Sequence, residues 1–174
     1  QRLASPSDVI DLGRIKELVG VEASADTLTI KAATTYFDIA QSADVKKSIP
    51  AIAQLTAMIG DPAVRSRGTI GGSIANNDPA ADFPAALVSL GATVKTNKRS
   101  ISADDFFKGL FTTALADGEI ITAVSFPIPA KAGYAKFPNP ASRYAMTGVF
   151  VAKDKDGVRV AVTGAGEGGV FRHK

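Results

Sequence analysis

Apolar and polar residues alternate over a short stretch near the start of the chain. Thr27-Leu28-Thr29-Ile30-Lys31 has the period of two that is typical of a strand buried on one face. The apolar run Leu18–Ala23 precedes it, and Ser24-Ala25-Asp26 between them has a turn composition. The two runs predict a β-hairpin, and Val9-Ile10-Asp11-Leu12 predicts a further short strand before it.

The period changes to that of a helix after this region. Ile52, Leu55 and Ile59 recur at the spacing of one helix face. Pro50 precedes them and suits the first turn of a helix, while Gly60 follows them and suits its end. A helix over residues 51–59 is therefore expected, followed by a turn at Asp61-Pro62.

Three shorter helices are predicted from residues that commonly cap a helix. Thr34 or Thr35 precedes the run from Tyr36 to Ala40, with Tyr36, Phe37, Ile39 and Ala40 as the helical contacts. Asp82 precedes the apolar segment Phe83–Leu90, where Pro84 is tolerated in the first turn. Ser102 precedes Ala103-Asp104-Asp105, whose acidic residues favour the start of a helix.

Strand patterns dominate the rest of the chain. Ala92–Thr96 and Glu119–Pro127 are rich in β-forming residues, and two apolar runs, 145–152 and 158–163, flank Asp156-Gly157 as in a hairpin. Four prolines between 127 and 140 predict a linker. The fold class is therefore α+β: a mixed sheet with two or three helices over residues 1–128, then a partial antiparallel sheet over 129–174.

The composition removes several kinds of chemistry. The chain has 174 residues, a net charge of +3 and no cysteine, so it can supply no disulfide, thiolate or iron–sulfur ligand. Its one histidine, His173, lies in a tail expected to fray, which argues against a Ser-His-Asp triad. Lys and Arg are scattered rather than clustered, so no nucleic-acid partner is expected. No membrane span or signal peptide is recognisable, and we expect a cytoplasmic protein.

Two glycine-rich segments are candidates for a nucleotide site. Gly164–Gly169 matches G-x-G-x-x-G, but no helix or acidic residue follows at the required distance, so we interpret it as a turn. In Arg67–Ala75, Gly71 and Gly72 lie between Thr69 and Ser73. Such a segment could form an open loop whose uncovered N–H groups bind a pyrophosphate, or simply a turn, and composition alone favours the turn.

The second segment carries a resemblance to a known family. Arg67–Ala75, followed by Asp78-Pro79-Ala80-Ala81-Asp82-Phe83-Pro84 and a short helix, resembles the flavin-binding subunit of the molybdenum hydroxylases, the xanthine dehydrogenase and carbon monoxide dehydrogenase family. The same resemblance extends in order through Val9–Leu12, Asp117–Ile121, Pro138–Ala145 and Val160–Gly166.

The resemblance implies a fold and a cofactor site. Residues 1–128 would form an FAD-binding domain of the PCMH type, mainly its second subdomain and without the family's first glycine-rich loop. Residues 129–174 would begin a carbon monoxide dehydrogenase flavoprotein C-terminal domain. The FAD-binding residues implied are Thr69, Ile70, Gly71, Gly72, Ser73, Asp82, Ile121 and Lys136. For Asp82 a helix cap, and for Lys136 a solvated surface lysine, are the alternatives.

The function implied is that of an FAD-binding electron-transfer subunit, which passes electrons from iron–sulfur centres to an external acceptor. The iron–sulfur centres would lie on a small partner subunit and the molybdenum cofactor on a large one, with no catalytic side chain or metal ligand in this chain. With one glycine-rich loop only, the chain alone is expected to be inactive and to bind FAD weakly. The alternatives are a self-contained FAD-dependent oxidoreductase of the same fold and a non-catalytic assembly module.

Overall fold

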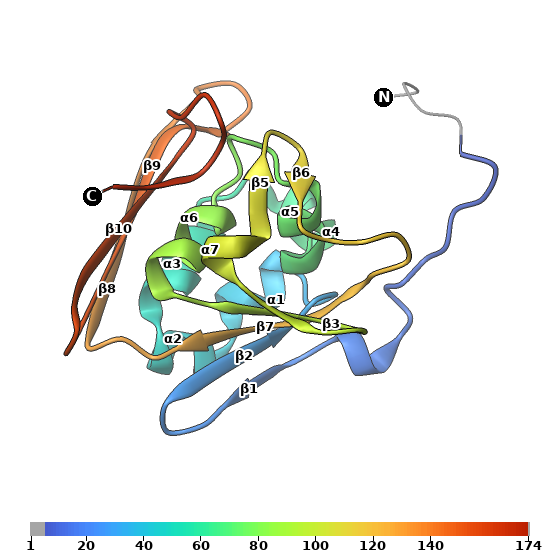
Figure 1. Ribbon diagram of the computed structural model, residues 1–174, viewed down its shortest axis with the longest axis horizontal. Helices are drawn as coiled ribbons and strands as arrows, with labels where there is room; N and C mark the ends of the chain where they lie inside the picture. The colour runs from blue at the N-terminus through green and yellow to red at the C-terminus, as the bar shows by residue number, and fades with distance from the viewer. Residues whose placement is uncertain (1–5, 174) are drawn as a thin grey trace.

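The computed structural model describes residues 6–173, and its largest sheet is the five-stranded antiparallel sheet at the bottom of Figure 1. Its strands run in the order β1 (Val21–Ala23), β2 (Thr27–Lys31), β7 (Ile121–Pro127), β3 (Thr93–Thr96) and β4 (Ser100–Ser102). The expected hairpin is confirmed by the pairing of Glu22 with Thr29. Leu28 and Ile30 of β2 are fully buried, while Thr29 is partly exposed, as the alternation predicts.

Helices cover one face of this sheet (Figure 1). In chain order they are α1 (Tyr36–Gln41), α2 (Ala43–Ser48), α3 (Pro50–Ala57), α4 (Pro62–Arg67), α5 (Ile70–Asn76), α6 (Phe83–Leu90) and α7 (Ala103–Phe106), after a short 3-10 helix, η1 (Lys16–Leu18). Thr35 caps α1 and Ser102 caps α7, each by accepting a hydrogen bond from a backbone N–H three residues ahead. The helices predicted over residues 51–59 and 83–90 are therefore present as α3 and α6. The expectation of a mixed sheet with two or three helices is wrong, because every strand pairing in this sheet is antiparallel and the described residues form seven α-helices.

A second, four-stranded antiparallel sheet stands on the other side of the helices (Figure 1). Its order is β11 (Phe171–His173), β10 (Gly157–Thr163), β9 (Ala145–Asp154) and β8 (Lys131–Pro138). The expected hairpin is confirmed as β9–β10. A small third sheet pairs β5 (Phe107–Gly109) with β6 (Thr112–Thr113).

The proline-rich linker expected between 127 and 140 is wrong. Most of it is β8, which pairs with β9 from Lys131 to Pro138. Because β8 is an edge strand, and because Pro138 lies at its end where the register shifts, a proline there removes no required sheet hydrogen bond.

Helix α6 lies between the two sheets and has no exposed residue. Every side chain from Phe83 to Leu90 is buried, and the helix contacts β7 of the first sheet as well as β9 and β10 of the second. Its one hydroxyl, Ser89 Oγ, donates to the carbonyl oxygens of Phe150 (2.6 Å) and Arg159 (3.2 Å). Both sheets therefore share one hydrophobic core.

Three local predictions differ from the structure. Val9–Leu12 forms no strand, and Val9 and Ile10 are 84% and 82% exposed, because this segment runs along no free sheet edge. The Asp61-Pro62 turn is instead the start of α4, where Asp61 Oδ1 accepts the Val64 N–H at 2.9 Å. His173 is not in a frayed tail but pairs with Val160 in the sheet.

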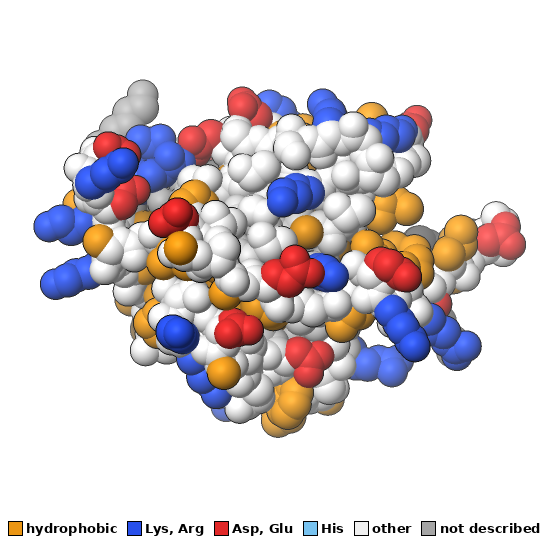
Figure 2. Space-filling view, turned by 90° about the horizontal axis from the view of Figure 1, so that it is seen from below, with side chains coloured by type: hydrophobic (Ala, Val, Ile, Leu, Met, Phe, Trp, Pro, Cys, Tyr) orange, Lys and Arg blue, Asp and Glu red, His pale blue; other side chains and the backbone are white. Residues whose placement is uncertain are grey.

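Charged side chains are interspersed on the lower face of the molecule, where Figure 2 shows blue and red groups side by side. Among residues 6–173, no helix has the length and apolar character needed to cross a membrane.

Candidate functional site

The segment with two adjacent glycines forms a helix, so both alternatives considered for it, the open loop and the turn, are wrong. Thr69 caps α5, and its Oγ1 accepts the Gly72 N–H at 3.1 Å. The Gly71 N–H donates to the carbonyl oxygen of Ala32, at 2.9 Å, and the Ser73 N–H donates to that of Thr69, at 3.0 Å. The N–H groups that sequence reasoning treated as uncovered therefore already have partners within the protein.

The two glycines serve different purposes. At Gly71 a Cβ atom would lie 2.7 Å from both Cβ and O of Ala32, so glycine allows α5 to pack directly on the end of β2. At Gly72 a Cβ atom would meet only Thr69 Oγ1, at 3.1 Å, and the residue is exposed. Gly72 therefore leaves the exposed surface of α5 free of a side chain, whereas Gly71 allows α5 to pack on Ala32.

Two clefts meet at the start of α5. The first, of about 410 Å³, is lined by Thr69, Gly72, Ser73 and Asp82 together with Tyr36, Arg67, Arg143 and Tyr144. The second, of about 320 Å³, is mostly apolar and is lined by Thr69, Gly71, Gly72 and Ile121 together with Leu12, Leu18, Leu115 and Ile120. Thr69 and Gly72 border both clefts.

A buried ion pair lies beside the first cleft. Lys136 Nζ is 2.9 Å from Asp82 Oδ1 and also donates to the Met58 carbonyl oxygen at 3.2 Å. Tyr134 Oη donates to the same Asp82 oxygen at 2.5 Å. Side-chain exposure is 1% for Lys136 and 4% for Asp82, so Lys136 is not the solvated surface lysine considered as the alternative. Asp82 makes no side-chain cap to α6, so that alternative is also wrong.

Burial dominates the electrostatics of this cluster. It raises the pKa of the Asp82 carboxyl, against the lowering effects of the Tyr134 hydrogen bond and the Lys136 charge. Burial, and next the Asp82 charge, raise the pKa of Tyr134 far above its ordinary value, so Tyr134 stays a hydrogen-bond donor. Burial also raises the pKa of Tyr36, while a hydrogen bond with Ser73 opposes the shift.

The first cleft contains an aromatic residue that sequence reasoning missed. Tyr144 is 53% exposed and lines the cleft from the loop between β8 and β9. The N–H of Asn139 donates to the Tyr144 carbonyl oxygen at 2.8 Å, which closes this loop. Tyr144 belongs to Pro138–Ala145, one of the segments that carry the family resemblance, so the sequence did point to this region. The position of Tyr144 at the cleft depends on the pairing of β8 with β9, which the sequence did not predict.

The comparison with protein families decides the identity of the fold. The model described as "FAD binding domain in molybdopterin dehydrogenase" matches residues 1–129. The chain belongs to this family.

Relatives of this FAD-binding family confirm the assignment. The chain is 40% identical over 157 residues to the glyceraldehyde dehydrogenase medium chain of Sulfolobus acidocaldarius, covering 87% of this chain and 56% of that protein. It is 37% identical over 174 residues to the nicotine 6-hydroxylase medium subunit of Paenarthrobacter nicotinovorans, covering 94% of this chain and 62% of that one. The chain thus spans less than two thirds of the length of these relatives.

Solved structures show the same fold. Carbon monoxide dehydrogenase from Hydrogenophaga pseudoflava superposes with a TM-score of 0.90 at 33% identity, over 98% of this chain and 63% of that chain. Quinoline 2-oxidoreductase from Pseudomonas putida 86 also gives 0.90, at 32% identity, over 98% of this chain and 63% of that one. The expected α+β fold of the PCMH type is confirmed, and FAD is the cofactor of the family.

The structure brings most of the predicted site residues together. Thr69, Gly72, Ser73 and Asp82 line the first cleft, and Thr69, Gly71, Gly72 and Ile121 line the second. Lys136 lies behind Asp82, and Ile70 is fully buried in the core and lines neither cleft.

The second glycine-rich segment, Gly164–Gly169, connects β10 to β11 and precedes no helix, as expected of a turn. Within the described residues, no group of three or more His, Asp or Glu side chains is arranged to hold a metal ion.

Proposed function

We propose that this chain is part of the FAD-binding electron-transfer subunit of a molybdenum hydroxylase, and that FAD lies across its two clefts. One observation carries the proposal: Thr69 and Gly72 border both clefts. FAD has two ring systems joined through a pyrophosphate, so a ligand of this shape places one ring system in each cleft and its phosphates at the shared border. The lack of a side chain at Gly72 leaves room for that crossing.

The character of each cleft supports an orientation. We assign the isoalloxazine ring to the first cleft, which offers Asp82, Tyr36 and Tyr144, and the adenosine to the mostly apolar second cleft beside Ile121. Thr69 and Ser73 are proposed to bind the pyrophosphate through their hydroxyl groups. Ile70 and Gly71 support the site from behind, since one is in the core and the other packs on Ala32.

The buried pair is proposed to hold the polar edge of the flavin in place. Lys136 fixes Asp82 against Tyr134, so the carboxylate has one defined position at the cleft. The flavin, when bound, supplies the electron transfer, and the side chains of this chain bind it, orient it and exclude water. No residue of the chain is required to act as a general base.

Partner subunits follow from the same proposal. The chain has no cysteine, so iron–sulfur centres would lie on another subunit, and the molybdenum cofactor on a third. The relatives are described as medium chains or subunits, which supports a multi-subunit enzyme. A division into domains at 128/129 and a cytoplasmic location stay predictions.

The proposal is tested by titrating FAD into the ¹⁵N-labelled chain and following amide shifts by NMR, a method that also detects weak binding. Saturable shifts at Gly68, Gly72 and Ser73 together with Ile120 and Ile121 are expected, because these residues line the two clefts. No saturable shift at millimolar FAD, or shifts confined to one cleft, would contradict the proposed site.

A further inference from the structure

Two arginines of the first cleft have no assigned role. Arg67 is the last residue of α4, and Arg143 lies in the loop between β8 and β9. Both are exposed and both line the cleft that Thr69, Gly72 and Ser73 also line. Within residues 6–173, neither guanidinium group makes a side-chain hydrogen bond or an ion pair. Their charges are thus free to meet a ligand.

We propose that Arg67 and Arg143 bind the pyrophosphate of FAD and supply most of the positive charge that it requires. This inference rests on the proposed function. It makes these two side chains binding residues of the site, in addition to the hydroxyl groups of Thr69 and Ser73.

The hydrogen bonds of α5 give the first reason. A phosphate at a glycine-rich segment is ordinarily held by unpaired backbone N–H groups. Here the N–H groups of Gly71, Gly72 and Ser73 donate to Ala32 O, Thr69 Oγ1 and Thr69 O. A doubly charged pyrophosphate therefore needs other donors, and a guanidinium group is well suited to phosphate oxygens.

The charges around the cleft give the second reason. Asp82 is neutralised by Lys136, while Arg65 donates to the carbonyl oxygens of Ile59 and Gly60, each at 3.0 Å. Asp78 lines the cleft as well and is a negative group that a phosphate would encounter. Arg67 and Arg143 are therefore the cleft's uncommitted cations among the described residues, and both are needed to offset Asp78 and the ligand.

The backbone of Arg143 gives the third reason. Its φ angle is +61°, a left-handed conformation that is unfavourable for a side chain of this size. Asn139 holds it there: Asn139 Oδ1 accepts the N–H groups of Ala141 (2.9 Å) and Ser142 (3.0 Å), and Asn139 O accepts that of Arg143 (2.9 Å). The loop thus maintains a strained residue at the cleft, as is common at binding sites.

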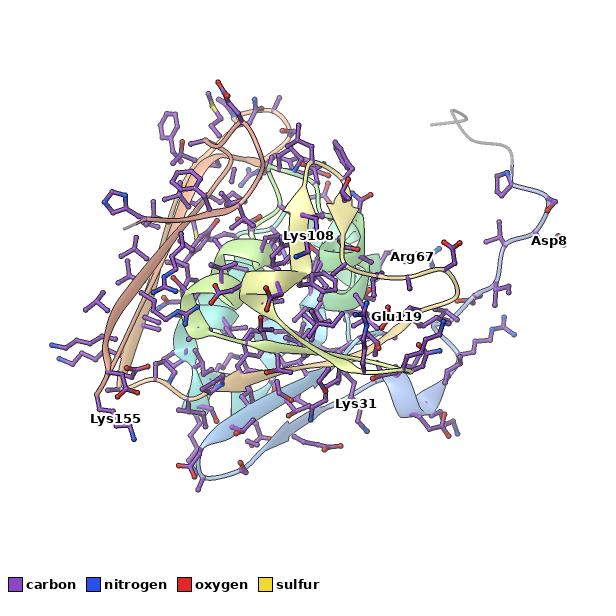
Figure 3. All side chains as sticks on the ribbon, in the orientation of Figure 1. Asp8, Lys31, Arg67, Lys108, Glu119 and Lys155 are labelled. Atoms are coloured by element: carbon purple, nitrogen blue, oxygen red, sulfur yellow. The ribbon has the colours of Figure 1, made fainter. Side chains whose placement is uncertain are left out.

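The test compares FAD affinity in Arg67→Gln, Arg143→Gln and the double variant, measured by the same NMR titration of the 174-residue chain. Each single substitution is expected to weaken FAD binding about tenfold, because it removes one charge-assisted hydrogen bond to the pyrophosphate. Lys155→Gln is the matched control, because Lys155 lies at the tip of the β9–β10 hairpin, far from Arg67 in Figure 3.

Salt concentration gives a second readout. FAD affinity of the unchanged chain is expected to fall as NaCl is raised from 50 to 500 mM, and the double variant is expected to lose most of this dependence. Arg67→Lys retains the positive charge, so its FAD affinity is expected to depend on NaCl concentration as that of the unchanged chain does.

The outcomes separate the inference from the proposed function. If the unchanged chain binds FAD saturably and the FAD affinity of the double variant lies within twofold of that of the unchanged chain, only the role of the arginines is overturned. Failure of the unchanged chain to bind FAD overturns the proposed function as well. Weakening by Lys155→Gln equal to that by Arg67→Gln would show an effect of net charge and would also overturn the inference.

Discussion

Lys136 and Asp82, 54 positions apart in the sequence, form an ion pair of 2.9 Å that is almost wholly enclosed by protein. The pair joins β8 of the four-stranded sheet to the residue that precedes α6. A charge pair removed from water is stable only while both members are present, because either one alone would be a buried, uncompensated charge.

Replacing Lys136 with Met is therefore expected to destabilise the fold by about 3–5 kcal/mol, since it leaves Asp82 without its partner. The measurement is the free energy of unfolding in urea. The double variant Asp82→Asn, Lys136→Met is expected to recover part of the loss. Lys131→Met, at an exposed position of the same strand, is the control. Equal stability of the Lys136 and Lys131 variants would contradict a structural role for the pair.

Tyr134→Phe is expected to cost about 1–3 kcal/mol, because Asp82 loses a buried donor while the ring is preserved. The ring packs near Phe150, with centroids 6.0 Å apart, and this contact is unchanged by the substitution. Urea unfolding measures the loss. A variant as stable as the original chain would mean that water replaces the hydroxyl group at Asp82.

Substitutions at the two glycines of α5 are expected to affect different properties, the stability of the fold at Gly71 and FAD binding at Gly72. Gly71→Ala places a methyl group against Ala32 and is expected to destabilise the fold by about 1–3 kcal/mol. In Gly72→Val the new Cβ atom would contact only the side chain of Thr69, so the stability is expected to stay nearly unchanged. The same side chain would occupy the border of the two clefts and is expected to abolish FAD binding. Thermal unfolding and FAD titration distinguish the two effects. Unimpaired FAD binding by the Gly72 variant would contradict the site.

Glu119 predicts a dependence of stability on pH. Hydrogen bonds from Arg99, the Ala116 N–H and Thr96 lower the pKa of its carboxyl from 4.5 to about 2. A pKa lower in the folded state than in the unfolded state means that the ionised form stabilises the fold. This contribution is complete above pH 4.5 and is lost as the pH falls toward 2.

The check is urea unfolding of the chain and of Glu119→Gln at pH 7, 4 and 3. The difference in stability between the two proteins should be largest at pH 7 and should shrink at each lower pH. A difference that stays constant would show that the Glu119 charge does not contribute through its shifted pKa.

Much of the fold was accessible from local patterns. The β1–β2 hairpin, α3, α6 and the β9–β10 hairpin each combine a clear period with a recognisable turn or cap, so the sequence predicts them correctly. β8 was missed because the prolines around it resemble a linker, and Pro138, the one proline within it, is acceptable because it lies at the end of an edge strand. α5 was missed because Gly71 and Gly72 have low helix propensity, which the close packing on Ala32 overrides.

The site was predictable only in part for a similar reason. Thr69, Gly72 and Ser73 are adjacent in sequence, so a motif can indicate them. The pairing of Asp82 with Lys136, and the presence of Tyr144 and Arg143 at the same cleft, depend on how β8 packs on α3 and β9 packs on α6. No periodicity within a single segment contains that information.

The complete burial of α6 has a consequence for how the molecule unfolds. Because this helix packs on β7 on one side and on β9 and β10 on the other, neither sheet can separate without exposing its apolar residues to water. The two sheets are thus one cooperative unit, and calorimetry should give a single transition with equal van't Hoff and calorimetric enthalpies. For the same reason, the first cleft cannot open by a hinge movement of one sheet away from the other. Any adjustment of the cleft to a ligand is therefore expected from side chains and loops at its rim, such as the loop that carries Tyr144.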